Sequence, residues 1–594
     1  SISEQHVSKD SENPLIETIT NIFKENISFI EKLPLAKRIY NTRINKTPSI
    51  EILKIIDDVA ANYVLEKQNE ERKKPSLMDL NNCIYCAAVS VNQHLDQLNK
   101  IEKDSHNKTP KLPNWLNNIQ ISIDKTRRDI GHIVTIMKCK VDNIYTNNQI
   151  KIKNRLDKKF RNTRKSTLDH HLCLLKHNLK AKSKKLKYHK NILETKRINK
   201  QFASNPKSVY RKMKGNLFNV KELPTKESVE DYWENIWGKR LQHNENAIWI
   251  NELESNYCSQ VNQKTYKIDN QILEKAIAKI QNGKAPGPDG IIGYWYKKLY
   301  FYRDHMAYLF QQSLEGKYEI PAEMVTAKTV LLPKNTNTHI PKNYRPIACL
   351  NLMYKLHTAC INMFIQDHCE SNGIITNEQA AGKKNVWGCT EQLMVNKIVL
   401  NEVRKLRRNL YTVWLDYAKA FDSVSHSWML QALRLAKLPE NIVIMIEKLS
   451  KLWTTIVTIK GDDQSILTNE IKYCKGIFQG DSLSVILFIL CLHPLSYLIN
   501  NLKGYAAGKD RNVDDLKLYS SALNGIKKQL DLVLTYSHDI GMQFGQEKCA
   551  YLMIKKGKIK SDGKNIVINQ LKLNQLEEGD TYKYLGMDEN ISYN

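Results

Sequence analysis

Residues 410–424, Leu-Tyr-Thr-Val-Trp-Leu-Asp-Tyr-Ala-Lys-Ala-Phe-Asp-Ser-Val, constrain the fold more than any other stretch of the chain. A short apolar run rich in β-forming residues ends on Asp416, and small residues then lead to Phe421. This pattern predicts a strand that presents a carboxylate at its end, with an aromatic ring five residues later. Such an arrangement suits a nucleotide polymerase, in which the carboxylate binds Mg²⁺ and the ring packs under the incoming sugar. Taken alone, an Asp at a strand end is more often a turn residue or a helix cap.

The charge of the chain indicates a polyanionic partner. Its 594 residues include 90 Lys and Arg against 62 Asp and Glu, a formal net charge of +28. The excess is concentrated in residues 151–214, which contain 22 Lys and Arg but only 3 acidic residues. A charge run is commonly a solvated surface, and a solvated helix pair is one interpretation of this stretch. Its almost purely cationic character favours contact with a phosphate backbone.

Length and cysteine usage limit the class of protein. A chain of 594 residues predicts two to four domains. The 12 cysteines are scattered, which fits a reducing compartment, and we expect an intracellular location in the nucleus and cytoplasm. Only Cys83 and Cys86 have metal-like spacing; a zinc site needs a second pair, so two cysteines near one helix face are favoured. The longest strongly apolar run, 485–492, is too short for a membrane span, and we expect no membrane partner.

Two predicted strands carry a cation each. Residues 329–334 form a strand pattern that ends on Lys334, and residues 343–347 restore a second strand that bears Arg345. A Lys and an Arg on neighbouring strands would suit a triphosphate, although two surface cations on a hairpin are an equal alternative. Helices are predicted before them, over residues 228–237 and 271–280, and the second of these ends at Asn282-Gly283.

Acidic and glycine-rich segments follow the opening stretch. The strand patterns at 455–460 and 465–468 flank Gly461-Asp462-Asp463, which we interpret as a hairpin turn. The loop at 476–484, with Gln479 and Gly480, opens an apolar helix that runs to about Leu502, and its glycines allow close backbone approach to a ligand. Residues 512–519 then place Asp514 and Asp515 before an alternating strand, and Lys548 and a strand at 582–586 come last.

The order of these motifs resembles the reverse transcriptases of non-LTR retrotransposons, particularly the site-specific, type-1 kind. The resemblance covers about residues 205–590. It extends only weakly to the first 200 residues. It implies an α/β right-hand polymerase with fingers and palm, an antiparallel palm sheet backed by helices, and a mostly helical basic N-terminal extension. The segments that carry it are 283–290, 332–334, 343–347, 378–382, 416–421, 476–484, 513–519 and 584–586.

The resemblance also implies a division of the chain. Residues 1–150 would form a helical extension, and residues 151–264 a basic nucleic-acid-binding region and linker. The fingers would span residues 265–400 and the palm residues 401–587. Residues 588–594 would be the truncated start of a thumb, and together with the missing initial Met this suggests a fragment.

The chemistry implied is nucleotidyl transfer with two Mg²⁺ ions. Asp416 and Asp514 would bind both ions, and Asp515 would be an assisting carboxylate. Lys548 would be the general acid for pyrophosphate. The partners would be an RNA template, a DNA primer and deoxynucleoside triphosphates.

The remaining site residues would bind the nucleotide. By similarity, Lys334 and Arg345 would clamp the triphosphate from the fingers. Gln479 and Gly480 would contact the nascent base pair and the template backbone. Phe421 would exclude a 2′-hydroxyl and so select deoxynucleotides, although a role in core packing alone is compatible with its position.

Two departures from the family pattern stand out. Val485 occupies a position where the family usually has Pro, which is tolerable at a helix start. More seriously, Asp514 follows residues 504–513, which contain no buried apolar strand ending in an aromatic residue. We therefore expect this partial or degenerate copy to polymerise poorly or not at all. The alternatives are a catalytically dead RNA-binding remnant and a group II intron-type maturase.

Overall fold

The computed structural model describes most of the chain in two compact units. One unit contains residues 1–98 and 220–594, and the other contains residues 99–219. The boundary predicted at residue 150 falls inside the second unit. The roles predicted for residues 1–150 and 151–264 remain predictions. The described residues are 14–38, 42–44, 47–105, 113–142, 146–160, 168–204, 222–258, 261–375, 388–461, 465–502, 510–511, 515–561, 566–568, 571–585 and 587–590.

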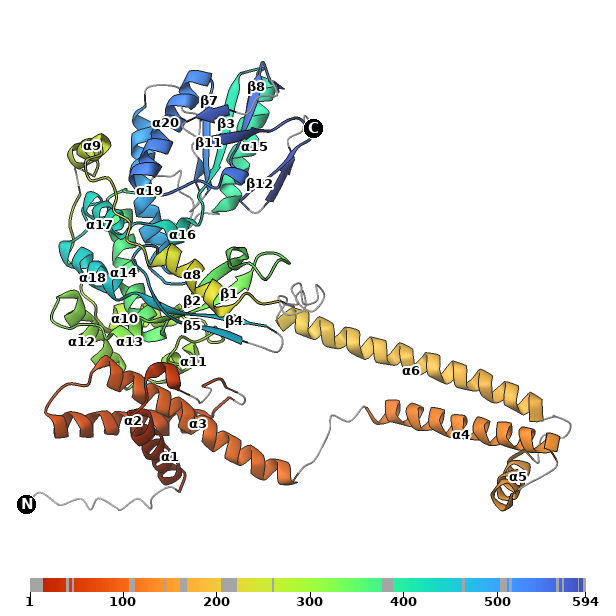
Figure 1. The fold of residues 1–594 in the computed structure, drawn as a ribbon. Helices are drawn as coiled ribbons and strands as arrows, with labels where there is room; N and C mark the ends of the chain where they lie inside the picture. The colour runs from red at the N-terminus through yellow and green to blue at the C-terminus, as the bar shows by residue number, and fades with distance from the viewer. Residues whose placement is uncertain are drawn as a thin grey trace, which may run out of the picture. The chain divides into compact units, whose positions relative to one another are not determined.

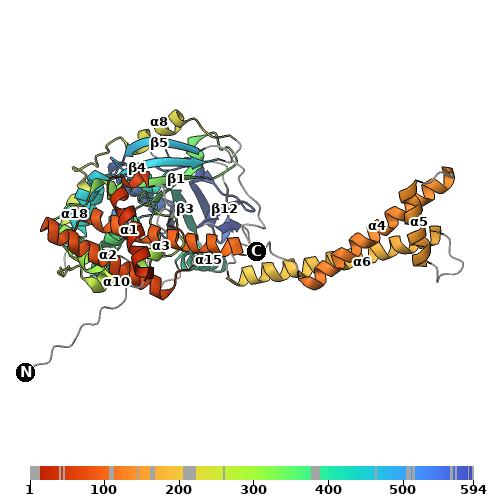
Figure 2. The same ribbon diagram turned by 90° about the horizontal axis from the view of Figure 1, so that it is seen from below.

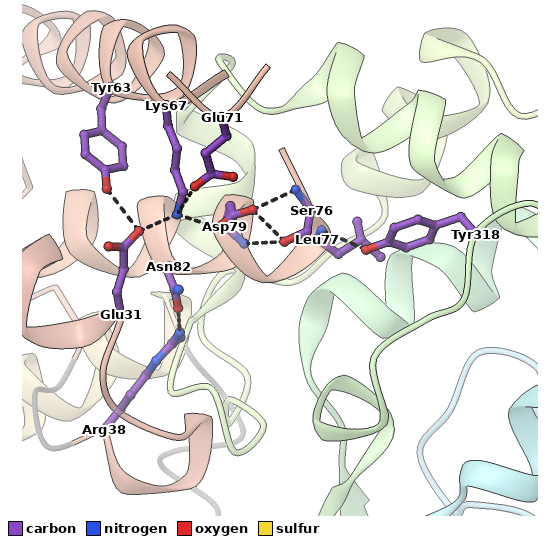
Figure 3. Close-up of polar contacts among 10 residues, drawn as sticks. All are labelled: Glu31, Arg38, Tyr63, Lys67, Glu71, Ser76, Leu77, Asp79, Asn82 and Tyr318. Carbon is purple, nitrogen blue, oxygen red and sulfur yellow. Dashed lines mark hydrogen bonds and ion pairs between the residues drawn. The ribbon is translucent and has the colours of Figure 1, made fainter. Parts of the chain in front are cut away.

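The first unit begins with α1 (Pro14–Ile30), α2 (Ile50–Glu71) and α3 (Leu77–Ser105), and the unit boundary after Leu98 falls within α3. Lys67 of α2 joins them, because its Nζ lies 2.7 Å from both Glu31 and Asp79 (Figure 3). The Leu77 amide donates to the Tyr318 hydroxyl at 3.1 Å, which links α3 to the loop after α12. Cys83 and Cys86 lie in α3 and are buried, as their helical interpretation predicts.

A partly buried arginine attaches these helices to the glycine- and proline-rich loop at 283–290. Arg38 Nη1 donates to Asn81 Oδ1 at 2.7 Å and to the Asp289 carbonyl at 3.3 Å. The Asn81 amide in turn donates to the Asp289 carboxylate at 3.2 Å. Gly287 is required for close approach, since a Cβ there would lie 2.4 Å from the backbone nitrogen of Asn351. The loop therefore connects the N-terminal helices to the rest of the first unit.

Helices with side-chain caps follow. The Thr225 side chain accepts from the Ser228 amide at 3.2 Å, and that of Asp269 accepts from the Ile272 amide at 2.9 Å. These caps begin the two helices predicted near residues 228 and 271, and both are confirmed. The helices of this region are α8 (Lys226–Trp237), α9 (Ile248–Asn256), α10 (Asn270–Ala278), α11 (Gly293–Lys298), α12 (Arg303–Leu314), α13 (Ala322–Val325) and α14 (Leu352–Ser371).

A four-stranded sheet has the order β2-β1-β4-β5 (Figure 1). Strands β1 (Ala327–Pro333) and β2 (Tyr344–Cys349) are antiparallel, and β1 runs parallel to β4 (Thr454–Lys460). Strand β5 (Ser465–Lys472) pairs antiparallel with β4, so the two strands of the predicted hairpin are confirmed. Asp462 and Asp463 lie outside the described residues. The sheet joins strands from both sides of the fingers–palm boundary predicted at residue 400.

A seven-stranded sheet contains the opening motif at its centre. Strand β3 (Leu410–Asp416) pairs antiparallel with β7 (Asp515–Ser520) on one side and with β8 (Ala550–Lys555) on the other. Beyond β8, strand β11 is parallel, the exception in an otherwise antiparallel sheet. The remaining strands are β6 (Asp510–Arg511), β9 (Lys558–Ile559), β10 (Ile566–Ile568) and β11 (Leu571–Gln575), with a separate hairpin of β12 (Thr581–Tyr584) and β13 (Met587–Asn590).

Helices cover both faces of this sheet, and β3 is therefore buried on both faces. Val413 and Leu415 share a core with α19 (Ser484–Asn501) and α20 (Leu523–Asp539). Trp414 points to the other face, where it shares a core with α15 (Cys389–Lys405). The predicted α/β fold with an antiparallel sheet backed by helices is therefore confirmed. Three shorter helices, α16 (Ala420–Ser423), α17 (His426–Leu435) and α18 (Glu440–Leu452), follow β3.

Helix α19 is the one helix in the described part of the chain that is long and apolar enough to cross a membrane. It continues nine residues past the apolar run noted in the sequence, and 72% of it is buried in the first unit. A helix that is apolar all round is expected at the centre of a large protein as well as in a membrane. Here it packs against α17 and α20.

The second unit consists of α4 (Asn114–Asp142), α5 (Asn147–Phe160) and α6 (Leu168–Ser204). Helices α4 and α6 lie side by side (Figures 1 and 2). Lys182 of α6 fixes their alignment, because its Nζ donates to Ser122 at 2.9 Å and to Thr126 at 3.2 Å. The described residues of the basic stretch 151–214 are thus helical, which is consistent with the interpretation of this stretch as a helix pair.

Candidate active site

Asp416 lies at the end of β3, as predicted. Its side chain is 15% exposed, and Lys548 Nζ donates to its Oδ2 at 2.7 Å. The Asp416 carbonyl accepts from the Gly545 amide at 2.8 Å, which brings the turn before Lys548 against the end of β3. The structure therefore joins two predicted site residues that are separated by 132 positions.

The strand register places Asp515, the second residue of the acidic pair, beside Asp416. Asp515, the first residue of β7, is the direct partner of Asp416 across the sheet. Asp514 lies outside the described residues, and only the backbone of Asp515 is described. Strand β6, which precedes the pair, comprises two residues that pair with Leu516 and Lys517.

The two predicted triphosphate ligands lie on the β1–β2 hairpin. Lys334 immediately follows β1, its amide donates to the Asn343 carbonyl at 2.7 Å, and both Lys334 and Arg345 are exposed. Partial desolvation and the nearby cations Arg345 and Lys548 lower the pKa of Lys334, whereas Asp422 opposes this shift. Lys334 therefore feels the charge of Lys548, the residue that contacts Asp416.

Phe421 lies between core and surface. Its ring stacks on Phe488 of α19, with centroids 5.0 Å apart and planes 8° apart, but it is only partly buried. The backbone carbonyl of Phe421 accepts from the Ile477 amide at 2.8 Å, so the ring is held beside the loop that carries Gln479. A rigid, partly exposed ring at this place fits the predicted sugar gate, and the stacking provides its support.

Replacing Phe421 with Ala is expected to admit ribonucleotides if the domain polymerises. Removal of the ring opens space for a 2′-hydroxyl, so the preference in kcat/KM for deoxynucleotides over ribonucleotides should fall about 10-fold or more. Phe421→Tyr keeps the ring and serves as the matched control. An unchanged preference in Phe421→Ala would show that the ring contributes core packing alone.

The glycine-bounded loop contacts the four-stranded sheet directly. The Gln479 carbonyl accepts from the Ala348 amide at 2.9 Å. Gly480 has φ +136°, and a Cβ there would lie 2.5 Å from the Ala348 carbonyl oxygen. Glycine is therefore needed at this position for both its backbone angle and its close approach to β2.

Asp422 is a site residue that the sequence analysis missed. Its buried carboxylate accepts from the Trp237 indole at 3.0 Å and from the Gln479 side-chain amide at 3.3 Å. Burial raises the pKa of Asp422 to about 6, although the Trp237 hydrogen bond and the nearby cations Lys419 and Lys334 lower it. Asp422 thus orients the predicted base-pair contact. The signal in the sequence that could have identified Asp422 was its position directly after Phe421. Its hydrogen-bond partners Gln479 and Trp237 lie 57 and 185 residues away in the sequence.

The part of the chain that carries these residues is similar to known proteins. A family model described as reverse transcriptase (RNA-dependent DNA polymerase) matches residues 332–588, which include β2 to β12. Residues 332–588 belong to the reverse transcriptase family. The predicted resemblance to non-LTR retrotransposon reverse transcriptases is confirmed.

The similar curated proteins are retrotransposon polyproteins. The Pol polyprotein from the type-1 retrotransposable element R2 of Nasonia vitripennis is 27% identical over 282 residues, which covers 45% of this chain and 26% of that protein. The Pol polyprotein from the type-2 element R2DM of Drosophila melanogaster is 23% identical over 382 residues, 62% of this chain and 34% of that protein. The chain thus spans about a quarter to a third of the length of these relatives.

Among solved structures, part of this chain is similar to a telomerase. The apo telomerase from Candida tropicalis truncated from its C-terminal domain is 15% identical, with a TM-score of 0.30. The match covers 41% of this chain and 56% of that chain.

Proposed function

We propose that this reverse transcriptase domain copies an RNA template into DNA by adding deoxynucleotides to a primer 3′-hydroxyl. The observation that carries the proposal is the meeting of Asp416 with Lys548 at the end of β3, directly opposite Asp515. The hairpin cations Lys334 and Arg345 supply positive charge for the triphosphate, and Lys548 is poised to protonate the leaving pyrophosphate.

Reverse transcriptases generally use divalent metal ions, and the described residues fit one. Asp416 supplies a partly exposed carboxylate oxygen, the ligand type that Mg²⁺ prefers, and the register adds a second acidic residue opposite it. We propose that Asp416 and Asp514 hold two Mg²⁺ ions. When bound, these ions would activate the primer hydroxyl and neutralise the triphosphate. The described residues include no group of three or more His, Cys, Asp or Glu side chains that could hold a metal ion, and Asp514 is not among the described residues.

Primer extension tests the activity. The purified chain is incubated with poly(rA), a DNA primer, deoxynucleotides and Mg²⁺, and Asp416→Ala is the control. We propose that extension is weak, because the two residues of β6 that the structure describes in front of the acidic pair, Asp510 and Arg511, are both charged. If neither this chain nor a variant with a restored strand extends a primer, catalysis is overturned. The catalytically dead RNA-binding remnant, which the short β6 also favours, would then be the function.

We also propose that the second unit binds RNA phosphates. Helix α6 carries ten Lys and Arg residues against two acids. Lys176, Lys180, Lys184 and Lys187 recur at helical spacing and are exposed, so they form one row along α6. We propose in addition an intracellular location in the nucleus and cytoplasm, supported by the free thiols of the described cysteines.

Neutralising this row is expected to weaken RNA binding in a salt-dependent manner. The slope of log affinity against log salt should become less steep by up to about 3, since each neutralised phosphate on a single strand contributes roughly 0.7. Substitution is preferable to deleting residues 151–214, because deletion would expose the buried face of α4. If the slope is unchanged, the row does not contact phosphates. The four lysines are replaced with Gln, and the control replaces four exposed lysines of the first unit, Lys24, Lys54, Lys448 and Lys451.

A further inference from the structure

The second unit brings together aromatic rings that are distant in sequence. Trp115, near the start of α4, contacts His189 of α6 edge to face, with ring centroids 4.9 Å apart. Tyr188 contacts the same His189 ring at 5.4 Å. Trp115 is nevertheless 46% exposed and Tyr188 is 63% exposed. The pair of rings is therefore held in place by the helix packing while much of its surface remains in solvent.

The surroundings of these rings are cationic. Lys184 and Lys185 lie one helical turn before Tyr188, and Lys187 and Lys190 flank it on α6. The first turn of α4, which contains Trp115, has no acidic residue. The acidic residue of α6 that follows Tyr188 in sequence is Glu194, and it forms an ion pair with Arg197 at 2.7 Å. Exposed aromatic rings among lysines are the two components of a single-strand binding surface, in which bases stack on rings and phosphates meet cations.

We infer that Trp115 and Tyr188 form a stacking site for unpaired bases of RNA. This inference rests on the proposed function, since the RNA is the template, and it adds base contact to the phosphate contacts proposed above. A duplex keeps its bases stacked inside, so only an unpaired segment offers a base face to these rings. His189 is the positioning residue, because it holds both rings.

The test compares an unstructured RNA with an abasic analogue that has the same number of phosphates. Binding of labelled oligonucleotides to the full chain is measured by fluorescence anisotropy at about 0.15 M salt. Trp115→Ala should weaken binding to the base-bearing RNA by about 5-fold or more and leave binding to the abasic analogue unchanged. Its salt slope should equal that of the unchanged chain, because the phosphate contacts are the same.

Matched variants separate stacking from folding. Tyr188→Phe keeps a ring and should keep the ratio of the affinity for base-bearing RNA to the affinity for the abasic analogue. Tyr188→Ala should lower this ratio. Leu174→Ala removes a similarly exposed apolar side chain about four turns earlier on α6 and should have no effect. Circular dichroism checks that each variant retains its helices.

Three results would overturn the inference. The first is an unaltered ratio of the affinities for base-bearing and abasic RNA in Trp115→Ala. The second is equal binding of duplex and single-stranded RNA. The third is a ratio of base-bearing to abasic affinity that is larger for single-stranded DNA than for RNA. Primer extension is not a readout of this experiment. A chain that fails to polymerise but shows the predicted ratio would contradict the proposed activity and leave the stacking site standing.

Discussion

Inserting an apolar strand of about six to eight residues, ending in an aromatic residue, before Val513 is expected to raise primer extension by on the order of 100-fold. Two-metal chemistry requires Asp416 and Asp514 on adjacent strands at a fixed separation. The register aligns β7 with β3, and among the described residues β6 pairs with β7 through Asp510 and Arg511. Charged residues in place of an apolar strand are costly to bury in a sheet.

The controls for this experiment separate position from length. A Gly/Ser insertion of the same length should leave extension at the level of the unmodified chain, because it adds no buried strand. Asp416→Ala in the restored variant should abolish extension. Strong extension by the unmodified chain that Asp416→Ala abolishes would show that the two residues of β6 suffice.

Replacing Arg38 with Met is expected to lower the free energy of unfolding of the first unit by about 3–5 kcal/mol. Arg38 is partly buried and donates to Asn81 and to the Asp289 carbonyl, while the Asp289 carboxylate is fully buried. Without the guanidinium, Asp289 would be a buried charge with weaker compensation. The loss is measured by urea denaturation followed by tryptophan fluorescence, with hydrogen exchange of α3 as a local readout.

A surface arginine provides the comparison. Arg408, which is 55% exposed beside Glu402, should lose no more than about 1 kcal/mol as Arg408→Met. The double variant Arg38→Met/Asp289→Asn should lose less than the sum of its single changes, because the buried charge is gone. Equal losses in Arg38→Met and Arg408→Met would contradict a supporting role for Arg38.

The effect of Arg38→Met should also depend on pH. Burial raises the pKa of Asp289 to about 6, whereas Arg38 and the Asn81 hydrogen bond lower it. A raised carboxyl pKa in the folded state means that stability is lost as pH rises from about 4 through about 6. Removing Arg38 raises this pKa further, so the loss should be larger at pH 7 than at pH 4. A loss that is the same at both pH values would show that Asp289 is not the group involved.

Local sequence determined the elements that carry the site. The β-forming run before Asp416 predicted β3, and the turn residues after residue 334 separated β1 from β2 as observed. The glycine-bounded loop predicted the start of α19 within one residue. These predictions succeeded because strand and helix periods, capping and turn preferences act over a few neighbouring residues.

Tertiary structure alone decided which of these residues meet. The contact of Lys548 with Asp416, the link from Trp237 through Asp422 to Gln479, and the pairing of β4 with β1 join segments far apart in sequence. The same holds for Trp115 beside His189 in the second unit. Each contact depends on strand order, register and the burial of a whole face, and these are set by the sum of packing over the unit and not by any local period.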